Sequence, residues 1–494
     1  MPPGAGAPGD RGPAGTRRRR LPGWAVPGAL ALTAAAALVA AVLIESGDSA
    51  AQAVSSPGAV VTPVLSARRA PDVIAAPVGD RRLTADLDAW LAASPADTCL
   101  VVAGEGREVY DRNGVQPVTG ASTQKLLTAT GLLMALGPDA RFTTTAVAAR
   151  EPQGGVITGD LYVVGGGDAA LATGDWALAN PGRPRAVHDV DALAAAIAAA
   201  GVTQIQGSVV GDGSRYDDQR YEPSLAPRLI AQNQIGPIGG LMVNDGFGGA
   251  GPSAPSGDPA LDAARVVTDR LAAHGVTVTG TPVAGVAPPG AVAVASIDSP
   301  PVSQIVAEML TFSDNETAES AMKEVGRSVS GEGTWAAGAA GVTSLLAQAG
   351  VSVDGVRVVD GTGLSIEDQL TCQTLVDVLA RPETGPVLRS GLPVAGQSGT
   401  LIDRWEDSPV AGRLRAKTGT LRNVTALAGE VQAAQGGSIT FAYVANVPDP
   451  GSVTFEQVGL ERLGEILLAY PEGVDLAALA PLPADTVAGP AAAG

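Results

Sequence analysis

Three segments of the chain share one hydrophobic pattern, in which an apolar run ends at a glycine and continues into β-branched residues. They are residues 190–200 with Gly201-Val202, 259–274 with Gly275-Val276, and 343–349 with Gly350-Val351. Glycine favours the left-handed conformation that closes a helix, and β-branched runs favour strands. The pattern predicts a helix, a turn and a strand in each segment. Asp258-Pro259 adds an N-cap and a first-turn proline to the second helix.

The C-terminal part of the chain contains three runs with the composition of β-strands, at residues 414–417, 425–433 and 438–447. Gln435-Gly436-Gly437 has the residues of a hairpin turn between the last two. Residues 455–470 then carry apolar side chains at helical spacing. We therefore expect a mixed α/β fold, with an antiparallel sheet flanked by helices.

The N-terminal region has the pattern of an exported protein. Residues 1–20 form a Pro/Gly-rich and basic segment, which we expect to be disordered and which ends in four arginines. Residues 21–44 carry no charge and are long enough to span a bilayer, which favours a signal anchor; Ala51-Gln52-Ala53 leaves cleavage of a signal peptide open as the alternative. Residues 45–75 are expected to be a linker, and residues 472–494 a disordered tail.

Charge and composition exclude several classes of function. The 494 residues include 32 Lys and Arg against 50 Asp and Glu, a net charge of −18. Such a balance argues against a nucleic-acid partner, because phosphate binding needs clustered basic residues. Two cysteines and two histidines argue against a cysteine-based or histidine-based metal site, and no cofactor is expected. An extracytoplasmic location permits a disulfide between Cys99 and Cys372, although two separate buried thiols remain possible.

Lysine is rare in this chain, and two of the three lysines lie in recognisable motifs. Lys323 has an ordinary explanation, a surface pair with Glu319 one helical turn earlier. Lys125 instead follows Ser122 by three residues at the start of a helix that ends at Gly137-Pro138. This spacing places an amine beside a hydroxyl, which activates a serine nucleophile where no histidine is present.

Two further motifs follow in the order that serine acyl-transfer enzymes use. Ser313-Asp314-Asn315 lies between two helical segments, 303–310 and 316–325, and Lys417-Thr418-Gly419-Thr420 ends a predicted strand. Ser-x-x-Lys, Ser-x-Asn and Lys-Thr-Gly in this order are the signature of penicillin-binding proteins and serine β-lactamases.

Additional segments make the chain resemble one family among these proteins, the low-molecular-mass class C penicillin-binding proteins, which are D-alanyl-D-alanine carboxypeptidases and endopeptidases. The resemblance covers about residues 80–470 and includes Gly159–Asp168, Ser299-Pro300-Pro301, Asp360–Ser365 and Leu392–Gly396. It implies a penicillin-recognising, serine β-lactamase-like domain made from residues 76–145 and 293–471. The long interval between Ser122 and Ser313 implies an inserted α/β domain at residues 146–292. Glu316, directly after the triplet, departs from the apolar residue expected there.

The resemblance also implies the roles of the motif residues. Ser122 attacks the carbonyl carbon of a D-Ala-D-Ala stem peptide of peptidoglycan, and Lys125 is the base. Ser313 passes a proton to the leaving amine, and Asn315 binds the substrate amide. Lys417, Thr418 and Thr420 hold the terminal carboxylate, while Gly419 permits close backbone approach. β-Lactams are expected to acylate Ser122 and inhibit the enzyme.

Two alternatives remain open from the sequence, a β-lactamase of the same fold and a non-catalytic envelope protein that binds peptidoglycan. Fast penicillin deacylation in class A β-lactamases uses a glutamate that activates water. No glutamate between Asn315 and Lys417 is followed four residues later by the asparagine that usually accompanies it. Glu316, Glu319 and Glu324 are expected on a helix surface. We therefore expect slow turnover of penicillin.

Overall fold

The computed structural model describes residues 70–95, 97–104, 106–180, 188–248, 255–433, 437–448 and 450–470. The basic segment and anchor predicted at residues 1–44, residues 45–69 of the predicted linker, and the tail predicted at residues 472–494 lie outside these ranges. Residues 70–75, the end of the predicted linker, instead form the start of helix α2 (Ala70–Leu91), so that part of the prediction is wrong. None of the described helices is long and apolar enough to cross a membrane.

One five-stranded antiparallel sheet combines the first two strands of the described chain with its last three, in the order β13-β14-β15-β1-β2. Its strands are β1 (Asp97–Gly104), β2 (Arg107–Arg112), β13 (Leu414–Leu421), β14 (Val424–Gln432) and β15 (Ser438–Asn446). The three strands predicted near the C-terminus are therefore confirmed. β14 and β15 pair from Val424 with Asn446 to Gln432 with Ser438, and most of the predicted turn between them lies outside the described residues.

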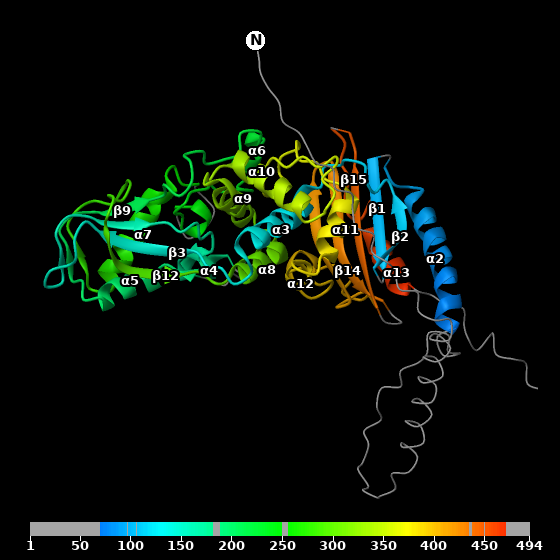
Figure 1. Ribbon diagram of the computed structural model, residues 1–494, viewed down its shortest axis with the longest axis horizontal. Helices are drawn as coiled ribbons and strands as arrows, with labels where there is room; N and C mark the ends of the chain where they lie inside the picture. Colours follow the sequence, from blue (N-terminus) through cyan, green and yellow to red (C-terminus); the bar gives the residue numbers. More distant parts are fainter. Residues whose placement is uncertain are drawn as a thin grey trace, which may run out of the picture. The chain divides into compact units, whose positions relative to one another are not determined.

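Alternate residues of this sheet enter two different hydrophobic cores, because successive side chains of a strand point to opposite faces. Leu100, Leu427 and Phe441 pack under α2 (Ala70–Leu91) and α13 (Leu460–Ala469). Val101, Ala428 and Val444 pack on the other face, toward α11 (Cys372–Ala380) and α3 (Lys125–Leu136) (Figure 1). The predicted sheet flanked by helices is thus confirmed, although α13 starts later than the predicted residue 455.

A disulfide joins the sheet to the helical layer. Cys99 of β1 and Cys372 at the start of α11 are bonded, with their Cα atoms 6.0 Å apart and a sequence separation of 273. The alternative of two separate buried thiols is therefore wrong. The bond ties the first strand to a helix that follows the whole inserted region.

A helical layer lies between this sheet and the region that contains β3–β12 (Figure 1). Besides α3 and α11 it contains α8 (Val302–Phe312), α9 (Asn315–Ser330), α10 (Trp335–Gln348) and α12 (Gly385–Ser390). α3 packs against α8, α9 and α10, so the helix that follows Ser122 is enclosed by apolar neighbours.

A second five-stranded sheet, of mixed direction, has the order β11-β9-β5-β3-β12. Its strands are β3 (Thr143–Ala148), β5 (Leu161–Val164), β9 (Val209–Asp212), β11 (Val283–Ala284) and β12 (Val292–Asp298). Helices α5 (Asp191–Ala199) and α7 (Pro259–Ala273) contribute to its core. β3 and β12 pair antiparallel, and the predicted first and last residues of the insertion, 146 and 292, lie in these two strands. The boundaries of the inserted domain stay a prediction.

Short elements complete this region. They are the helices α4 (Gly174–Ala179) and α6 (Pro227–Ala231), the strands β4 (Val156–Ile157), β8 (Gln204–Ile205) and β10 (Thr277–Val278) of a small parallel sheet, and the pair β6 (Leu171–Ala172) and β7 (His188–Asp189).

The three predicted glycine-terminated helices have different outcomes. Gly201, Gly275 and Gly350 all have positive φ angles, near +80°, as a left-handed closing residue requires. Strands β8 and β10 directly follow the first two, but among the described residues the next element after Gly350 is helix α11 and not a strand. That segment is irregular because Val351 turns into the helical core instead of joining a sheet.

The predicted surface position of the charged residues on α9 is wrong. Glu316, Glu319, Lys323 and Glu324 are all buried. Lys323 does not pair with Glu319; its Nζ donates to an Asp217 carboxylate oxygen at 2.5 Å and lies 3.7 Å from the centre of the Trp335 ring. Glu324 accepts from Arg215 at 2.8 Å. The segment that contains Arg215 and Asp217 covers α9, and no pattern local to the helix reveals that cover.

Candidate active site

Ser122 lies in a tight turn directly before α3. The turn is the 3-10 helix η1 (Ala121–Gln124), which Ala121 enters with a φ of +46°. Lys125, the first residue of α3, is fully buried, and its Nζ lies 3.1 Å from Ser122 Oγ. Nζ also donates to Asn315 Oδ1 at 2.7 Å and to the Thr362 carbonyl oxygen at 3.0 Å. Burial lowers the pKa of Lys125 to about 8, against several nearby carboxylates that raise it.

Ser313 and Asn315 are held at the junction of two helices. Ser313 caps the C-terminus of α8 in the left-handed conformation, with a φ of +59°. Asp314 then caps α9, and its carboxylate accepts from Thr317 N–H at 2.8 Å. Asn315 starts α9 and donates from Nδ2 to the Gln234 carbonyl oxygen at 2.6 Å. The junction thus fixes both side chains of the triplet toward Lys125 and Ser122.

Strand β13 forms the opposite wall of the site. Lys417 is fully buried, and its Nζ donates to Ser313 Oγ at 2.9 Å. Burial, with a smaller contribution from Lys125, holds the pKa of Lys417 well below its usual value. A side chain at Gly419 would place its Cβ 2.6 Å from the Gly120 carbonyl oxygen, so only glycine lets β13 lie this close to the turn that carries Ser122.

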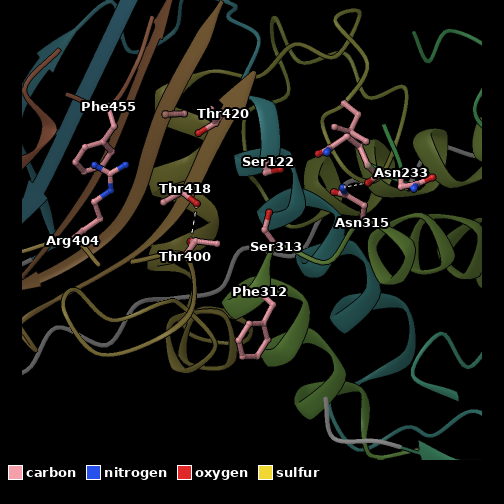
Figure 2. A pocket seen from close by; sticks show the side chains of 13 residues that line it. Ser122, Asn233, Phe312, Ser313, Asn315, Thr400, Arg404, Thr418, Thr420 and Phe455 are labelled. Carbon is pink, nitrogen blue, oxygen red and sulfur yellow. Dashed lines mark hydrogen bonds between the residues drawn. The ribbon is translucent and has the colours of Figure 1, made fainter. Parts of the chain in front are cut away.

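These residues enclose an open pocket of about 410 Å³ (Figure 2). Five of the eight predicted site residues line it: Ser122, Ser313, Asn315, Thr418 and Thr420. Lys125, Lys417 and Gly419 lie behind this lining, in contact with it. The three motifs, far apart in sequence, therefore meet around one pocket. A serine hydroxyl with a buried amine of lowered pKa is suited to nucleophilic attack on a carbonyl carbon.

Comparison with known proteins decides the family. Residues 83–250 and 249–459 match the D-Ala-D-Ala carboxypeptidase 3 (S13) family. The chain belongs to this family. Carboxypeptidase DacB from Mycolicibacterium smegmatis is 32% identical over 456 residues, which cover 88% of this chain and 95% of that protein. A D-alanyl-D-alanine carboxypeptidase from Actinomadura sp. is 28% identical over 439 residues, 73% of this chain and 79% of that protein.

The fold comparison agrees with the sequence comparison. Penicillin binding protein 4 from Haemophilus influenzae aligns with 78% of this chain and 99% of its own length, with a TM-score of 0.65 at 20% identity. The resemblance drawn from the motifs is therefore confirmed, and the protein is a serine-type D-Ala-D-Ala carboxypeptidase that acts on peptidoglycan outside the cytoplasm. The family match favours this activity over a β-lactamase or a non-catalytic envelope protein.

The carboxypeptidase also uses a loop for which the sequence showed only a resemblance and no role. The Asp360 carboxylate accepts from the backbone N–H groups of Thr362 and Ser365, both at 2.8 Å. This holds the loop so that Thr362 presents its carbonyl oxygen to Lys125. Glu319 Oε2 accepts from Gly361 N–H at 2.9 Å and from Trp335 Nε1 at 2.6 Å, and burial raises the pKa of Glu319 to about 8. The signal for this role was the dense run of small and polar residues at 360–365.

Glu316, the departure from the family pattern, has a structural role in this carboxypeptidase. Its Oε1 accepts from Gly236 N–H at 2.8 Å, so it joins α9 to the segment that supplies Gln234. Glu316, Asp245 and Asp314 bring carboxylate oxygens within 4.8 Å of one another, a spacing that could hold a metal ion. Asp314 serves as a helix cap and Glu316 as a link between segments, so a structural role accounts for both residues.

The two histidines lie away from the pocket. His274 is the C-cap residue of α7, and its Nε2 lies 3.0 Å from an Asp191 carboxylate oxygen. His188, for which the sequence gave no role, pairs through Nδ1 with the buried Asp168.

Proposed function

We propose that Ser122 is the nucleophile of this carboxypeptidase and Lys125 its general base. The observation that carries the proposal is the 3.1 Å contact between Ser122 Oγ and a fully buried Lys125 Nζ whose pKa is about 8. About a tenth of such an amine is unprotonated at pH 7, and that form accepts the Ser122 proton as Oγ bonds to the substrate carbonyl carbon.

Collapse of the tetrahedral intermediate breaks the C–N bond, and Ser313 passes a proton to the leaving amine. The proximity of Ser313 Oγ to Lys417 Nζ, at 2.9 Å, supports this role, because a Lys417 N–H donates a hydrogen bond to the oxygen while the proton moves. Asn315 binds the amide on the acyl side, which is supported by its fixed position between Lys125 and Gln234. Water then hydrolyses the ester on Ser122.

The terminal carboxylate of the substrate binds at β13. The Thr418 and Thr420 hydroxyls face the pocket, and Lys417 lies behind them. Burial lowers the pKa of Lys417, but an incoming carboxylate favours its protonated form, which then supplies positive charge. Backbone N–H groups of Ser122 and Thr420 are the proposed oxyanion hole. Gly419 supports this arrangement because it lets β13 and the Ser122 turn approach each other.

The same chemistry makes Ser122 the site of acylation by β-lactams. Glu316, Glu319 and Glu324 are committed to hydrogen bonds or ion pairs within the protein. They are thus poorly placed to activate water against a penicilloyl ester, and slow deacylation follows. Penicillin binding protein 4 from Haemophilus influenzae, at 19% identity, has been solved with a bound β-lactam.

The finer location of the enzyme is part of the proposal. Residues 21–44 form a signal anchor that links the catalytic body to the outer face of the membrane, with cleavage near Ala53 as the alternative. The uncharged run after four arginines supports this. Detergent extraction of the full chain, compared with a chain that begins after residue 53, distinguishes anchor from cleaved peptide.

Two measurements on one preparation test the catalytic proposal: labelling by fluorescent penicillin, and release of D-alanine from a D-Ala-D-Ala peptide. The wild-type enzyme should show stoichiometric labelling with slow loss of label, and rapid D-alanine release. Ser122→Ala should abolish both, whereas the matched change Ser328→Ala, on the exposed part of α9, should not. Persistent labelling of Ser122→Ala would exclude Ser122 as the nucleophile, and rapid penicillin hydrolysis without D-alanine release would favour a β-lactamase.

A further inference from the structure

Arg404 places a positive charge at one end of the active-site pocket, and removal of D-alanine does not require this charge. Of the thirteen described residues that line this pocket, Arg404 is the one with a charged side chain (Figure 2). The others offer hydroxyl, amide or apolar groups. Because the chain as a whole carries a net charge of −18, an arginine at this position stands out.

Arg404 lies on the leaving-group side of Ser122. Figure 2 shows Asn315 and Asn233 on one side of Ser122, and Thr418, Thr400, Arg404 and Phe455 on the other. Thr418 Oγ1 and Thr400 Oγ1 lie 2.8 Å apart, so Arg404 follows the proposed carboxylate site along the wall of the pocket. A leaving group that extends past Thr418 therefore reaches Arg404.

The guanidinium group is held in place before any ligand binds. Its central carbon lies 4.4 Å from the centre of the Phe455 ring, and Nη1 is paired with Glu456. The hydrogen bond from Arg404 lowers the pKa of Glu456 to about 2, so this partner stays ionised. Glu456 does not line the pocket. It occupies one edge of the Arg404 guanidinium, which has five N–H donors, so other donors of Arg404 are left for a second anion.

The backbone beside Arg404 also indicates a functional position. Trp405 has a φ of +62°, a conformation that side chains other than glycine rarely adopt. Its buried ring packs edge-on against Phe455 at 5.4 Å, and its Nε1 donates to the Glu461 carbonyl oxygen at 3.0 Å. Strained residues of this kind concentrate at binding and catalytic sites. The packing of the Trp405 ring holds Phe455 at the pocket wall, and Phe455 in turn contacts the Arg404 guanidinium.

We infer that Arg404 and Phe455 form a leaving-group subsite that recognises a second carboxylate, beyond the one held at β13. A free D-alanine leaving group has a single carboxylate, which the β13 site already binds. The subsite therefore fits a longer leaving chain with a further carboxylate, as in a stem peptide cross-linked to another. This inference rests on the proposed function, since the direction of the substrate follows from it, and the bonds made and broken at Ser122 are the same.

The test compares three peptides that share their acyl part and differ in the leaving residue after D-Ala: D-alanine, D-2-aminoadipate, and the side-chain amide of D-2-aminoadipate. The aminoadipate and its amide differ in one charge and are nearly equal in shape. For the wild-type enzyme, kcat/KM should be about tenfold higher for the acid than for the amide, the usual range for a hydrogen bond to a charged group. In Arg404→Gln this ratio should fall to about one, and Arg404→Lys should retain part of it.

Arg462→Gln is the matched control, because Arg462 forms an exposed ion pair with Glu465 on α13, away from the pocket. It should leave the ratio unchanged. A wild-type ratio near one, or an equal ratio in Arg404→Gln and wild type, would overturn the inference while D-alanine release continued to support the proposed function.

Binding to an inactive enzyme separates the two hypotheses fully. Calorimetry with Ser122→Ala should show tighter binding of the acid peptide than of its amide, and the added change Arg404→Gln should remove the difference. Equal binding of the two peptides to Ser122→Ala would contradict the proposed subsite, whether or not the wild-type enzyme hydrolyses either peptide. Absence of all hydrolysis by the wild-type enzyme would contradict only the proposed function.

Discussion

Lys125 and Lys323 are both buried amines, on helices α3 and α9 that pack against each other, and yet their surroundings differ in kind. Lys323 Nζ contacts the Asp217 carboxylate and the Trp335 ring. The three hydrogen-bond partners of Lys125 are a hydroxyl, an amide oxygen and a carbonyl oxygen, none of them charged. Burial lowers the pKa of both amines and is the largest cause in each case.

The difference shows that burial alone does not make a lysine reactive. A carboxylate in contact restores the charged form and turns the amine into a structural cation. Around Lys125 the contacting acceptors are neutral, and carboxylates that are not in contact offset only part of the cost of burial, so the amine can release its proton near neutral pH. Lys125 therefore suits proton transfer, while Lys323 anchors α9 to the inserted region.

Replacing the two active-site lysines by arginine should give the largest effect and the sharpest contrast. Lys125→Arg should reduce penicillin acylation about 10³-fold, because guanidinium cannot act as a base near neutral pH. Lys417→Arg should retain more activity than Lys417→Ala, because the guanidinium that replaces the amine can still attract the substrate carboxylate. The rate of labelling by fluorescent penicillin measures all three. Equal losses in Lys125→Arg and Lys417→Arg would contradict the separate roles.

Disrupting the contacts of Lys323 should lower the stability of the protein without affecting acylation of Ser122. Asp217→Ala leaves Lys323 buried without its carboxylate, and removing one partner of such a pair costs about 3 kcal/mol. Urea unfolding should show this loss, whereas the fraction of folded enzyme labelled at Ser122 should stay complete. Asp218→Ala is the neighbouring control, since Asp218 is fully exposed and should change stability little. An unchanged unfolding midpoint for Asp217→Ala would show that the pair does not hold α9.

The sequence predicted which residues lie together at the pocket better than it predicted what surrounds them. Ser122, Lys125 and the other motif residues were predicted to lie together because the proposed chemistry needs fixed residue types at short spacings. In the structure five of them, Ser122, Lys125, Ser313, Asn315 and Lys417, take part in hydrogen bonds of 2.7–3.1 Å with one another. The strands β13–β15 and the cap at Asp258 were likewise found from local patterns, because their cause is local.

The errors share a physical origin, which is contact between segments far apart in sequence. Lys323 and Glu319 have the spacing of a surface pair, but both are enclosed by distant parts of the chain. Lys323 binds Asp217, which lies more than a hundred residues away in sequence. Glu319 binds the loop at Gly361 and the indole of Trp335. Arg404 and Phe455 gave no sequence signal, because their position at the pocket depends on how Trp405 packs against α13.

The pH dependence of acylation should report the uncharged surroundings of Lys125. Its pKa is lowered to about 8, and the reactive form is the free amine, so the rate should be low at acid pH and rise through pH 8. Between pH 6 and pH 8 the free-amine fraction grows about 50-fold. Stopped-flow measurement of penicillin acylation across this range gives the midpoint. A rate that is flat from pH 6 to pH 8 would be inconsistent with Lys125 as the base.

Substitution of Glu319 should have the smallest effect on acylation. It is a sensitive test of the comparison between Lys125 and Lys323, because the charge of Glu319 raises the pKa of both amines. An anionic Glu319 stabilises the protonated form of Lys125, so Glu319→Gln should move the midpoint of the acylation profile to lower pH. With its own pKa raised to about 8, Glu319 is only partly ionised near that midpoint, and the shift should be modest, roughly half a pH unit. The glutamine oxygen can still accept from Gly361 N–H and Trp335 Nε1, which preserves the loop. Glu332→Gln, an exposed acid after α9, controls for a general change of charge. A shift to higher pH would show that Glu319 acts on Lys125 by positioning the 360–365 loop and not through its charge.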